Sequence, residues 1–180
     1  RAGARVCACP TTERSLGDGI NPADTFLARG VPVALGTDTN AQIDLLEDAR
    51  ELETHLRLKH LQRVVLAPRP EPSAPPAPAA LAGLLLASAT RHGADCLRAP
   101  GGALEPGRPA DFFTVALDDP TLAGADADSL PAALVFAGGR SCIREVVVGG
   151  RPIVADGRHP RQSAITAAFL ALQRDLWSEP

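Results

Sequence analysis

One carboxylate in this sequence stands just after a short apolar run. Residues 31–35 read Val-Pro-Val-Ala-Leu, which predicts a buried strand, and Asp38 follows three residues later. In barrels of alternating strands and helices, catalytic groups gather at the carboxyl ends of the strands. An aspartate there can bind a metal ion and accept a proton from water. Taken alone, however, Asp38, Thr39 or Asn40 is more commonly a cap that accepts N–H groups of the next helix.

More polar side chains follow an earlier apolar run at residues 6–9. The stretch 11–20 contains glycines and predicts a loop after that strand. Its candidate site residues are Thr11, Thr12, Glu13 and Asp18. If the two strands are neighbours, this loop lies on the side of Asp38 and either lines a pocket or braces the aspartate. The alternative stays equally open, because threonines and carboxylates are ordinary turn residues.

The first third of the chain alternates strands and helices. Asn21-Pro22 predicts a helix start, with Asn at the N-cap and Pro in the first turn, and Gly30 predicts its end. A longer helix follows Asp38, because one apolar stripe recurs at helical spacing. Its members are Leu45, Ala49, Leu52 and Leu56. Strand, helix, strand, helix is the order of a parallel α/β sheet.

The rest of the chain mixes helices with short strands. Six prolines within residues 67–80 predict a linker or an expanded surface loop. A hairpin is predicted because Gly149-Gly150 suits a two-residue turn between residues 143–148 and 152–155. A further strand is predicted at 111–117, and helices at 81–90 and 130–137. The last helix has one apolar face, formed by Ile165, Phe169, Leu172 and Leu176.

Composition excludes several classes of protein. The chain has 180 residues, 45% of them apolar, which suffices for a packed core. A net charge of −3 without a long basic block argues against nucleic-acid binding, and no apolar run is long enough to span a bilayer. The chain starts within a strand pattern at Arg1 and contains no Met, so a fragment is expected.

The cysteines show no paired spacing of the kind that metal sites use. They are Cys7, Cys9, Cys96 and Cys142. Cys7 and Cys9 fall on one face of the first strand, because side chains alternate there with a period of two. Reduced, mostly buried thiols in a cytoplasmic protein are therefore expected.

An ordered series of short motifs changes the interpretation of Asp38. The sequence passes through Cys-Pro-Thr-Thr-Glu (9–13), Leu-Gly-Asp-Gly-Ile (16–20), Pro-Ala-Asp (22–24) and Gly-Thr-Asp (36–38). In this order the motifs resemble the amidohydrolase superfamily, and most closely its formimidoylglutamate deiminase branch. The resemblance continues through residues 47–58, 107–111 and 146–159. It leaves out the proline-rich stretch.

The resemblance implies an α/β fold: the C-terminal part of a (β/α)8 metal-dependent hydrolase barrel, joined to the end of a small β-domain. Residues 1–66 would hold barrel strands seven and eight with their helices. The other parts would be an insertion or linker (67–80), a helix that closes the barrel (81–100), a β-domain segment (101–158) and a final helix (159–180). Two barrel strands without the other six have open edges, so the isolated chain is expected to aggregate or to fold only around its C-terminal elements.

The resemblance also implies a role for Asp38. In the family, the matching aspartate binds a divalent metal, usually zinc, takes a proton from the attacking water and delivers it to the leaving ammonia. The implied reaction is hydrolysis of N-formimidoyl-L-glutamate to N-formyl-L-glutamate in histidine breakdown. The implied partner is a small-molecule substrate, with neither nucleic acid nor membrane. Family members are often homodimers, so a homodimer is a further expectation.

The chain departs from the family pattern in its metal ligands. The family's His-x-His pair and its other histidines belong to earlier barrel strands. None of the histidines here stands at the carboxyl end of a predicted strand; they are His55, His60, His92 and His159. Asp38 alone cannot hold a catalytic zinc, which takes three protein ligands. The 180 residues are therefore expected to be inactive by themselves.

Two alternative functions stay open. One is a deaminase of the guanine, cytosine or triazine type, against which Thr12-Glu13 argues, because those relatives carry a hydroxyl residue followed by Asn there. The other is a non-catalytic remnant that persists as a binding or structural protein.

Overall fold

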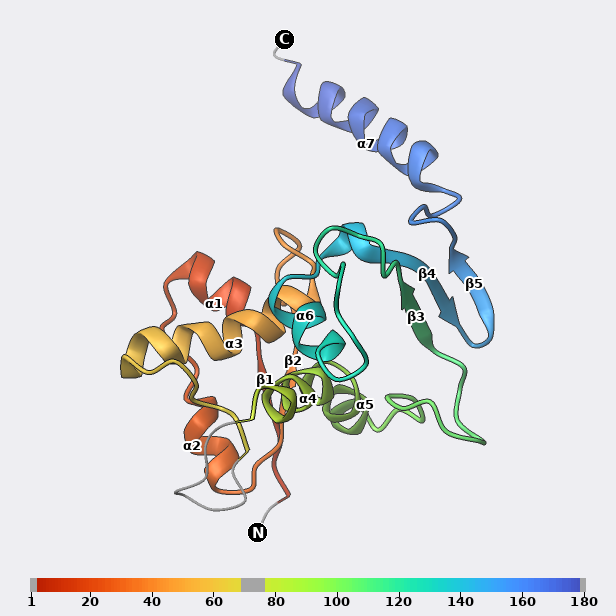
Figure 1. The fold of residues 1–180 in the computed structure, drawn as a ribbon. Helices are drawn as coiled ribbons and strands as arrows, with labels where there is room; N and C mark the ends of the chain where they lie inside the picture. Colours follow the sequence, from red (N-terminus) through yellow and green to blue (C-terminus); the bar gives the residue numbers. More distant parts are fainter. Residues whose placement is uncertain (1–2, 69–76, 179–180) are drawn as a thin grey trace.

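The computed structural model describes residues 3–68 and 77–178 (Figure 1). Most of the helices gather around a two-stranded sheet, and a three-stranded sheet and a last helix follow. In chain order the elements are β1 (Val6–Ala8), α1 (Pro10–Leu16), α2 (Ala23–Ala28), β2 (Val33–Leu35), α3 (Leu45–His60), α4 (Pro78–Ala89), α5 (Arg91–Leu97), β3 (Phe112–Val115), α6 (Leu130–Phe136), a 3-10 turn (Arg140–Cys142), β4 (Ile143–Val148), β5 (Arg151–Val154) and α7 (Gln162–Trp177).

The two strands of the first sheet run parallel, as the alternation of elements predicts. Val6 pairs with Val33 and Ala8 with Leu35. Strand β2 is shorter than the predicted 31–35 because Pro32 has no N–H to donate to a ladder. Since the strands are parallel, their carboxyl ends lie at the same edge of the sheet. The chain segments that follow β1 and β2 therefore meet there.

Helices α3, α4 and α5 pack against β2, and α3 and α4 form the main core with it. The predicted stripe of α3 is confirmed at three of its four positions. Ala49, Leu52 and Leu56 are buried, whereas Leu45 is 41% exposed and its neighbour Leu46 is buried in its place. Full burial of a leucine side chain is worth about 1.5–3 kcal/mol, so this stripe fixes α3 against the sheet.

The segment after β1 corrects the prediction of a loop at residues 11–20, because its first part is the helix α1. Pro10 occupies the first turn, where its missing N–H costs nothing. The carboxylate of Glu13 reaches back and accepts the N–H of Cys9 at 2.9 Å. Gly17 ends the helix in the left-handed conformation, with φ of 73°. Pro10 with Glu13 three residues later is thus a helix-start signal. The glycines at 17 and 19 led instead to the prediction of a loop.

Helix α2 begins one residue later than predicted, at Ala23 instead of Pro22. Its N-cap is Pro22, and no side chain caps it, so the prediction of Asn21 as the cap is wrong. The predicted end is confirmed at Gly30, whose φ of 69° is left-handed.

The proline-rich stretch 67–80 is only partly a connection. Residues 69–76 lie outside the described part of the chain. Residues 78–80 already belong to α4, so a linker that extends to residue 80 is wrong. Proline is tolerated at the first position of a helix, and Pro78 occupies it here. Helix α4 then buries Leu81, Ala82 and Leu85.

The second sheet has the order β3-β4-β5 and is antiparallel. The predicted hairpin is confirmed: β4 and β5 are joined by Gly149 and Gly150, with φ of 56° and 74°. Both values are left-handed, which glycine adopts without strain. Asp111, the residue before β3, fixes this turn, because its carboxylate accepts the N–H of Gly149 at 2.6 Å.

Helix α7 projects away from the other elements (Figure 1). None of its residues is buried. The predicted apolar face exists as a pattern, but Phe169 is 55% and Leu176 64% exposed, so this face packs against nothing in the described chain. Among residues 3–68 and 77–178, no helix is both long and apolar enough to cross a membrane.

Candidate functional site

The candidate site is the edge of the first sheet where β1 and β2 both end. The first turn of α1 directly follows β1, and residues 36–40 directly follow β2. The helix therefore brings Thr11, Thr12 and Glu13 to the edge that also carries Asp38. Successive side chains on a helix point about 100° apart, so these three contact different partners.

Asp38 is exposed to solvent at the end of β2. Its backbone is left-handed, with φ of 55°. Residues other than glycine rarely adopt this conformation, although aspartate tolerates it better than most. An exposed carboxylate held in an uncommon backbone conformation is a typical feature of a functional position.

Thr12 contacts the residues on both sides of Asp38. Its hydroxyl donates to the carbonyl oxygen of Thr37 at 2.6 Å and lies 3.0 Å from the hydroxyl of Thr39. It also accepts the backbone N–H of Thr39 at 3.3 Å. Thr12 is 3% exposed, so water does not compete for these contacts.

Thr11 points instead toward helix α3. Its N–H and its hydroxyl both donate to Oδ1 of Asp48, at 3.0 and 2.8 Å. Asp48 is fully buried. Burial raises the pKa of Asp48, and the two hydrogen bonds from Thr11 oppose this shift without cancelling it. Sequence reasoning missed Asp48; the only signal was a carboxylate beside Ala49 in the apolar stripe.

The other two predicted residues do not join Asp38. Glu13 caps α1 through Cys9, and Asp18 is exposed after the end of that helix. The structure thus divides the predicted set. Thr12 contacts the residues beside Asp38, and Thr11 contacts α3. Glu13 caps α1, and Asp18 follows it.

Cys7 lies in β1 and Cys9 directly follows it, and both thiols face Gly36, so they lie on one side as predicted. A side chain at Gly36 would come within 3.0 Å of Sγ of Cys7 and 3.4 Å of Sγ of Cys9. Partial burial raises the pKa of Cys7. Burial and then the neighbouring Cys7 thiol raise the pKa of Cys9 to about 12, and the charge of Asp38 contributes as well. Both groups therefore remain neutral thiols near neutral pH.

The expectation of mostly buried cysteines is wrong. Only Cys142 is buried; Cys7 is exposed, and Cys9 and Cys96 are intermediate. The face of β1 that carries Cys7 points away from the helices, because Ala8 of the other face fills the core.

The histidines serve other purposes. His60 lies 3.1 Å from Asp24, and His55 pairs with Glu51. Nδ1 of His92 lies 3.0 Å from the carbonyl oxygen of Val33. A carbonyl only accepts, so Nδ1 carries the proton in this contact.

A complete metal site is not formed by the part of the chain that the structure describes. In residues 3–68 and 77–178, no three His, Cys, Asp or Glu side chains are placed to hold a metal ion together. The exposed carboxylate of Asp38 fits a divalent cation as a single oxygen ligand. A catalytic zinc site takes three protein ligands, so the described residues supply one of these ligands and not the other two.

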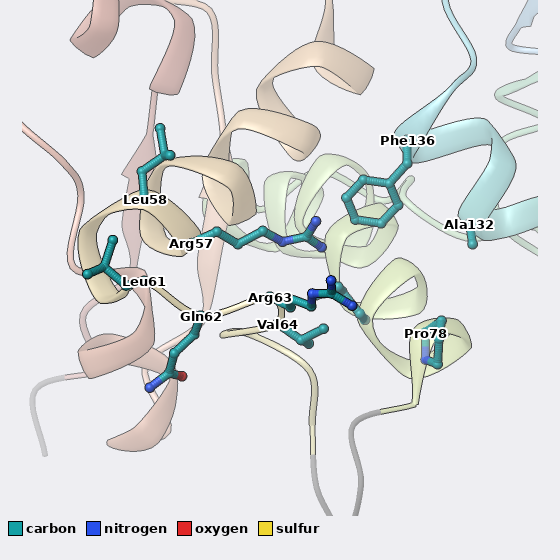
Figure 2. Close-up of a pocket in the computed structure, with 10 residues that line it drawn as sticks. Arg57, Leu58, Leu61, Gln62, Arg63, Val64, Pro78, Ala132 and Phe136 are labelled. Atoms are coloured by element: carbon teal, nitrogen blue, oxygen red, sulfur yellow. The ribbon is translucent and has the colours of Figure 1, made fainter.

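A wide pocket lies at the other end of helix α3 (Figure 2). It has a volume of about 820 Å³ and contains none of the predicted site residues. Helix α3 begins beside the Asp38 edge, and this pocket is built on its last turn, which is roughly 20 Å away at 1.5 Å per residue. The pocket is lined by Arg57, Leu58, Leu61, Gln62, Arg63, Val64, Pro78, Leu81, Ala132 and Phe136.

With this geometry in hand, the comparisons with known proteins identify the class of protein. The model of the amidohydrolase family matches residues 1–153. The chain therefore belongs to the amidohydrolase family.

Two curated relatives carry the comparison further. The chain is 38% identical to a formimidoylglutamate deiminase from Pseudomonas aeruginosa, over 98% of this chain and 37% of that protein. It is 34% identical to an 8-oxoguanine deaminase from the same organism, over 87% of this chain and 32% of that protein. The chain thus spans about a third of the length of the relatives that it matches.

Two solved structures match the fold. An amidohydrolase from Brucella melitensis superposes with a TM-score of 0.80 at 31% identity, over 96% of this chain and 36% of that one. A variant of an atrazine chlorohydrolase from Arthrobacter aurescens, complexed with zinc and atraton, superposes with a TM-score of 0.73 at 28% identity, over 95% of this chain and 36% of that one. These matches confirm the predicted fold class, part of an α/β-barrel hydrolase with a small β-domain segment.

Proposed function

We propose that the full-length protein is a deiminase that hydrolyses N-formimidoyl-L-glutamate to N-formyl-L-glutamate and ammonia. The observation that carries this proposal is the position of Asp38 at the carboxyl end of β2, opposite the first turn of α1. Its support is the 38% identity to a formimidoylglutamate deiminase over nearly the whole chain. In this proposal β1 and β2 are strands seven and eight of the barrel, and residues 101–158 belong to the small β-domain.

The residue that we assign to the chemistry is Asp38. Hydrolysis adds the oxygen of water to the formimidoyl carbon and breaks its bond to the terminal nitrogen, which leaves as ammonia. A carboxylate oxygen of Asp38 takes a proton from the attacking water and delivers it to the departing nitrogen. The exposed side chain of Asp38 suits this task, because it can contact both solvent and a substrate.

We also assign Asp38 as the ligand that this chain contributes to a divalent metal, which we propose to be zinc. The support is a zinc-bound structure among the matches and the fit of an exposed carboxylate to a divalent cation. Such a metal, when bound, supplies Lewis-acid chemistry and makes water more acidic.

The substrate is tested with the full-length protein. We expect ammonia release from N-formimidoyl-L-glutamate when zinc or iron is supplied. Absence of turnover with either metal would contradict the proposal. The same protein should be assayed for zinc content, since an enzyme without metal would also be inactive.

A second candidate substrate class is an aromatic aminoheterocycle. The observation that favours it is the similarity to an 8-oxoguanine deaminase and to an atrazine chlorohydrolase. A panel of guanine, cytosine and aminotriazine compounds separates the two candidates, because only this one predicts turnover there. If the protein binds zinc but turns over neither class of substrate, this result would favour a non-catalytic role.

The remaining expectations belong to the same proposal. A role in histidine breakdown follows from the substrate, and we propose a cytoplasmic location for such an enzyme. The proposed partner is the small-molecule substrate, and the proposed assembly is a homodimer.

A further inference from the structure

The hydroxyl of Thr12 makes three contacts with the residues on either side of Asp38. It donates to the carbonyl oxygen of Thr37, meets the hydroxyl of Thr39 and accepts the N–H of Thr39, at 2.6, 3.0 and 3.3 Å. The residues before and after Asp38 are thus attached to one oxygen atom. Within the described ranges, no other residue makes a side-chain hydrogen bond to Thr37 or Thr39.

This oxygen is itself held rigidly. Thr12 is 3% exposed and lies in the first turn of α1, where Pro10 precedes it and Glu13 caps the helix. The adjacent Thr11 is bonded twice to Asp48 of α3. The first turn of α1 is therefore fixed to the core on one side and contacts residues 37–39 on the other.

Asp38 needs such support. With φ of 55°, its backbone lies in a region that costs a residue other than glycine free energy in a free chain. Without contacts on both sides, the segment after β2 would relax toward right-handed conformations. That relaxation would move the carboxylate, because the direction of a side chain follows from the backbone of its own residue.

We infer that Thr12 is a positioning residue: its hydroxyl holds the backbone of Asp38 left-handed and so aims the carboxylate. This inference rests on the proposed function for its catalytic consequence only. The structural part, that Thr12 fixes residues 37–39, stands on the hydrogen bonds alone. In this inference Thr12 acts on the reaction through Asp38, because its hydroxyl contacts Thr37 and Thr39.

The catalytic consequence is tested with Thr12→Val and Thr12→Ser in the full-length protein. Valine keeps the shape and loses the hydroxyl, whereas serine keeps the hydroxyl. We expect Thr12→Val to lower kcat about 10- to 100-fold with little change in KM, as displacement of a catalytic group does. Thr12→Ser should restore most of kcat. A kcat of Thr12→Val equal to that of the wild type would overturn the inference.

A control variant separates positioning of Asp38 from the general effect of removing a threonine hydroxyl. Thr90→Val also removes a threonine hydroxyl that donates to a backbone carbonyl, that of Leu86 at 2.7 Å, but Thr90 is exposed and lies at the end of α4. It should leave kcat unchanged. An equal loss of kcat in both variants would mean that the effect is not specific to Thr12, and the inference would fail.

A second readout does not depend on the substrate. In Thr12→Val the amide of Thr39 loses its acceptor, so we expect its hydrogen exchange to become about fivefold faster, in keeping with the loss of one ordinary hydrogen bond. Unchanged exchange at residues 37–39 would overturn the inference even if the wild-type protein acted on another substrate. If Thr12→Val does not fold, Thr39→Val removes one of the three contacts without altering α1. It should show a smaller loss of kcat and faster exchange, and wild-type values for both would likewise contradict the inference.

Discussion

Thr11 donates both its backbone N–H and its hydroxyl to the same oxygen of Asp48, which is fully buried in α3. Oδ2 of Asp48 has no hydrogen-bond partner among the described residues. The contact joins the first turn of α1 to the longest helix of the core. It also leaves a carboxyl group in a place where its charge is poorly solvated, which raises its pKa.

This raised pKa makes stability depend on pH in a defined direction. The folded protein binds the proton of Asp48 more tightly than the unfolded chain does. The free energy of unfolding therefore falls as pH rises from the ordinary aspartate pKa, about 4, through the raised value. Asp48→Asn keeps an acceptor for Thr11 but does not titrate. We expect its free energy of unfolding to fall less over this pH window than that of the wild type, as measured by urea unfolding. Parallel profiles for the two proteins would contradict the assignment.

A second buried carboxylate fixes the chain beyond α3. Glu53 is fully buried and accepts the backbone N–H groups of Val65 and Leu66, at 3.0 and 2.9 Å, and the Nε–H of Arg57 at 2.8 Å. We expect Glu53→Gln to lower the free energy of unfolding by about 1–3 kcal/mol, because an amide NH2 would face N–H groups that need an acceptor.

The control for Glu53 is Glu105→Gln. Glu105 forms an exposed pair with Arg108, and such pairs contribute about 0–1 kcal/mol. Equal losses in the two variants, measured by chemical unfolding, would rule out a special role for Glu53.

Gly36 directly follows β2 and lies beside the thiols of Cys7 and Cys9. A methyl group there would meet Sγ of Cys7 at 3.0 Å, so Gly36→Ala should lower the melting temperature. The double variant with Cys7→Ala should recover part of this loss, because the sulfur is removed. If Cys7→Ala gives no recovery, the close contact is not the cause.

The chain offers an opposite control in Gly83. This glycine lies inside α4, and a side chain there would meet nothing within 4 Å. Alanine in place of a glycine inside a helix stabilises by about 0.5–1 kcal/mol. Gly83→Ala should therefore raise the melting temperature, and a decrease would show that α4 needs this glycine for another reason.

The 180-residue chain by itself should associate with other copies. Strands β1 and β2 each have one unpaired edge, and α7 exposes large apolar side chains including Phe169, Leu172 and Trp177. Such surfaces favour association. Light scattering during size-exclusion chromatography should report particles heavier than one chain of 18.7 kDa. A monodisperse monomer that melts cooperatively would contradict this expectation.

Local patterns sufficed to predict much of this fold. The hairpin at Gly149-Gly150, the parallel order of β1 and β2 and the buried stripe of α3 follow from turn chemistry and periodicity, which neighbouring residues determine. Helix α1 was not predicted, because its start depends on Glu13 reaching back to Cys9 while glycines nearby suggested a loop.

The site was only partly predictable. The motif order pointed to Asp38 and to the segment after β1, and the structure brings Thr12 beside it. Contacts between residues far apart in sequence were not visible beforehand. Thr11 and Asp48 are separated by 37 residues, and which of two adjacent threonines faces Asp38 depends on the rotation of α1. The burial of Asp48 likewise depends on how α1 and α3 pack.

The most direct test of the account is ammonia release from N-formimidoyl-L-glutamate by the full-length protein and its Asp38→Asn variant, both with measured zinc content and melting temperature. Asparagine preserves the size of the side chain and tolerates the left-handed backbone, but it cannot carry the proton. We predict turnover by the wild type and a loss of at least about 1,000-fold in the variant, with little change in the melting temperature. Activity retained by Asp38→Asn would contradict the assignment of this residue as metal ligand and proton carrier.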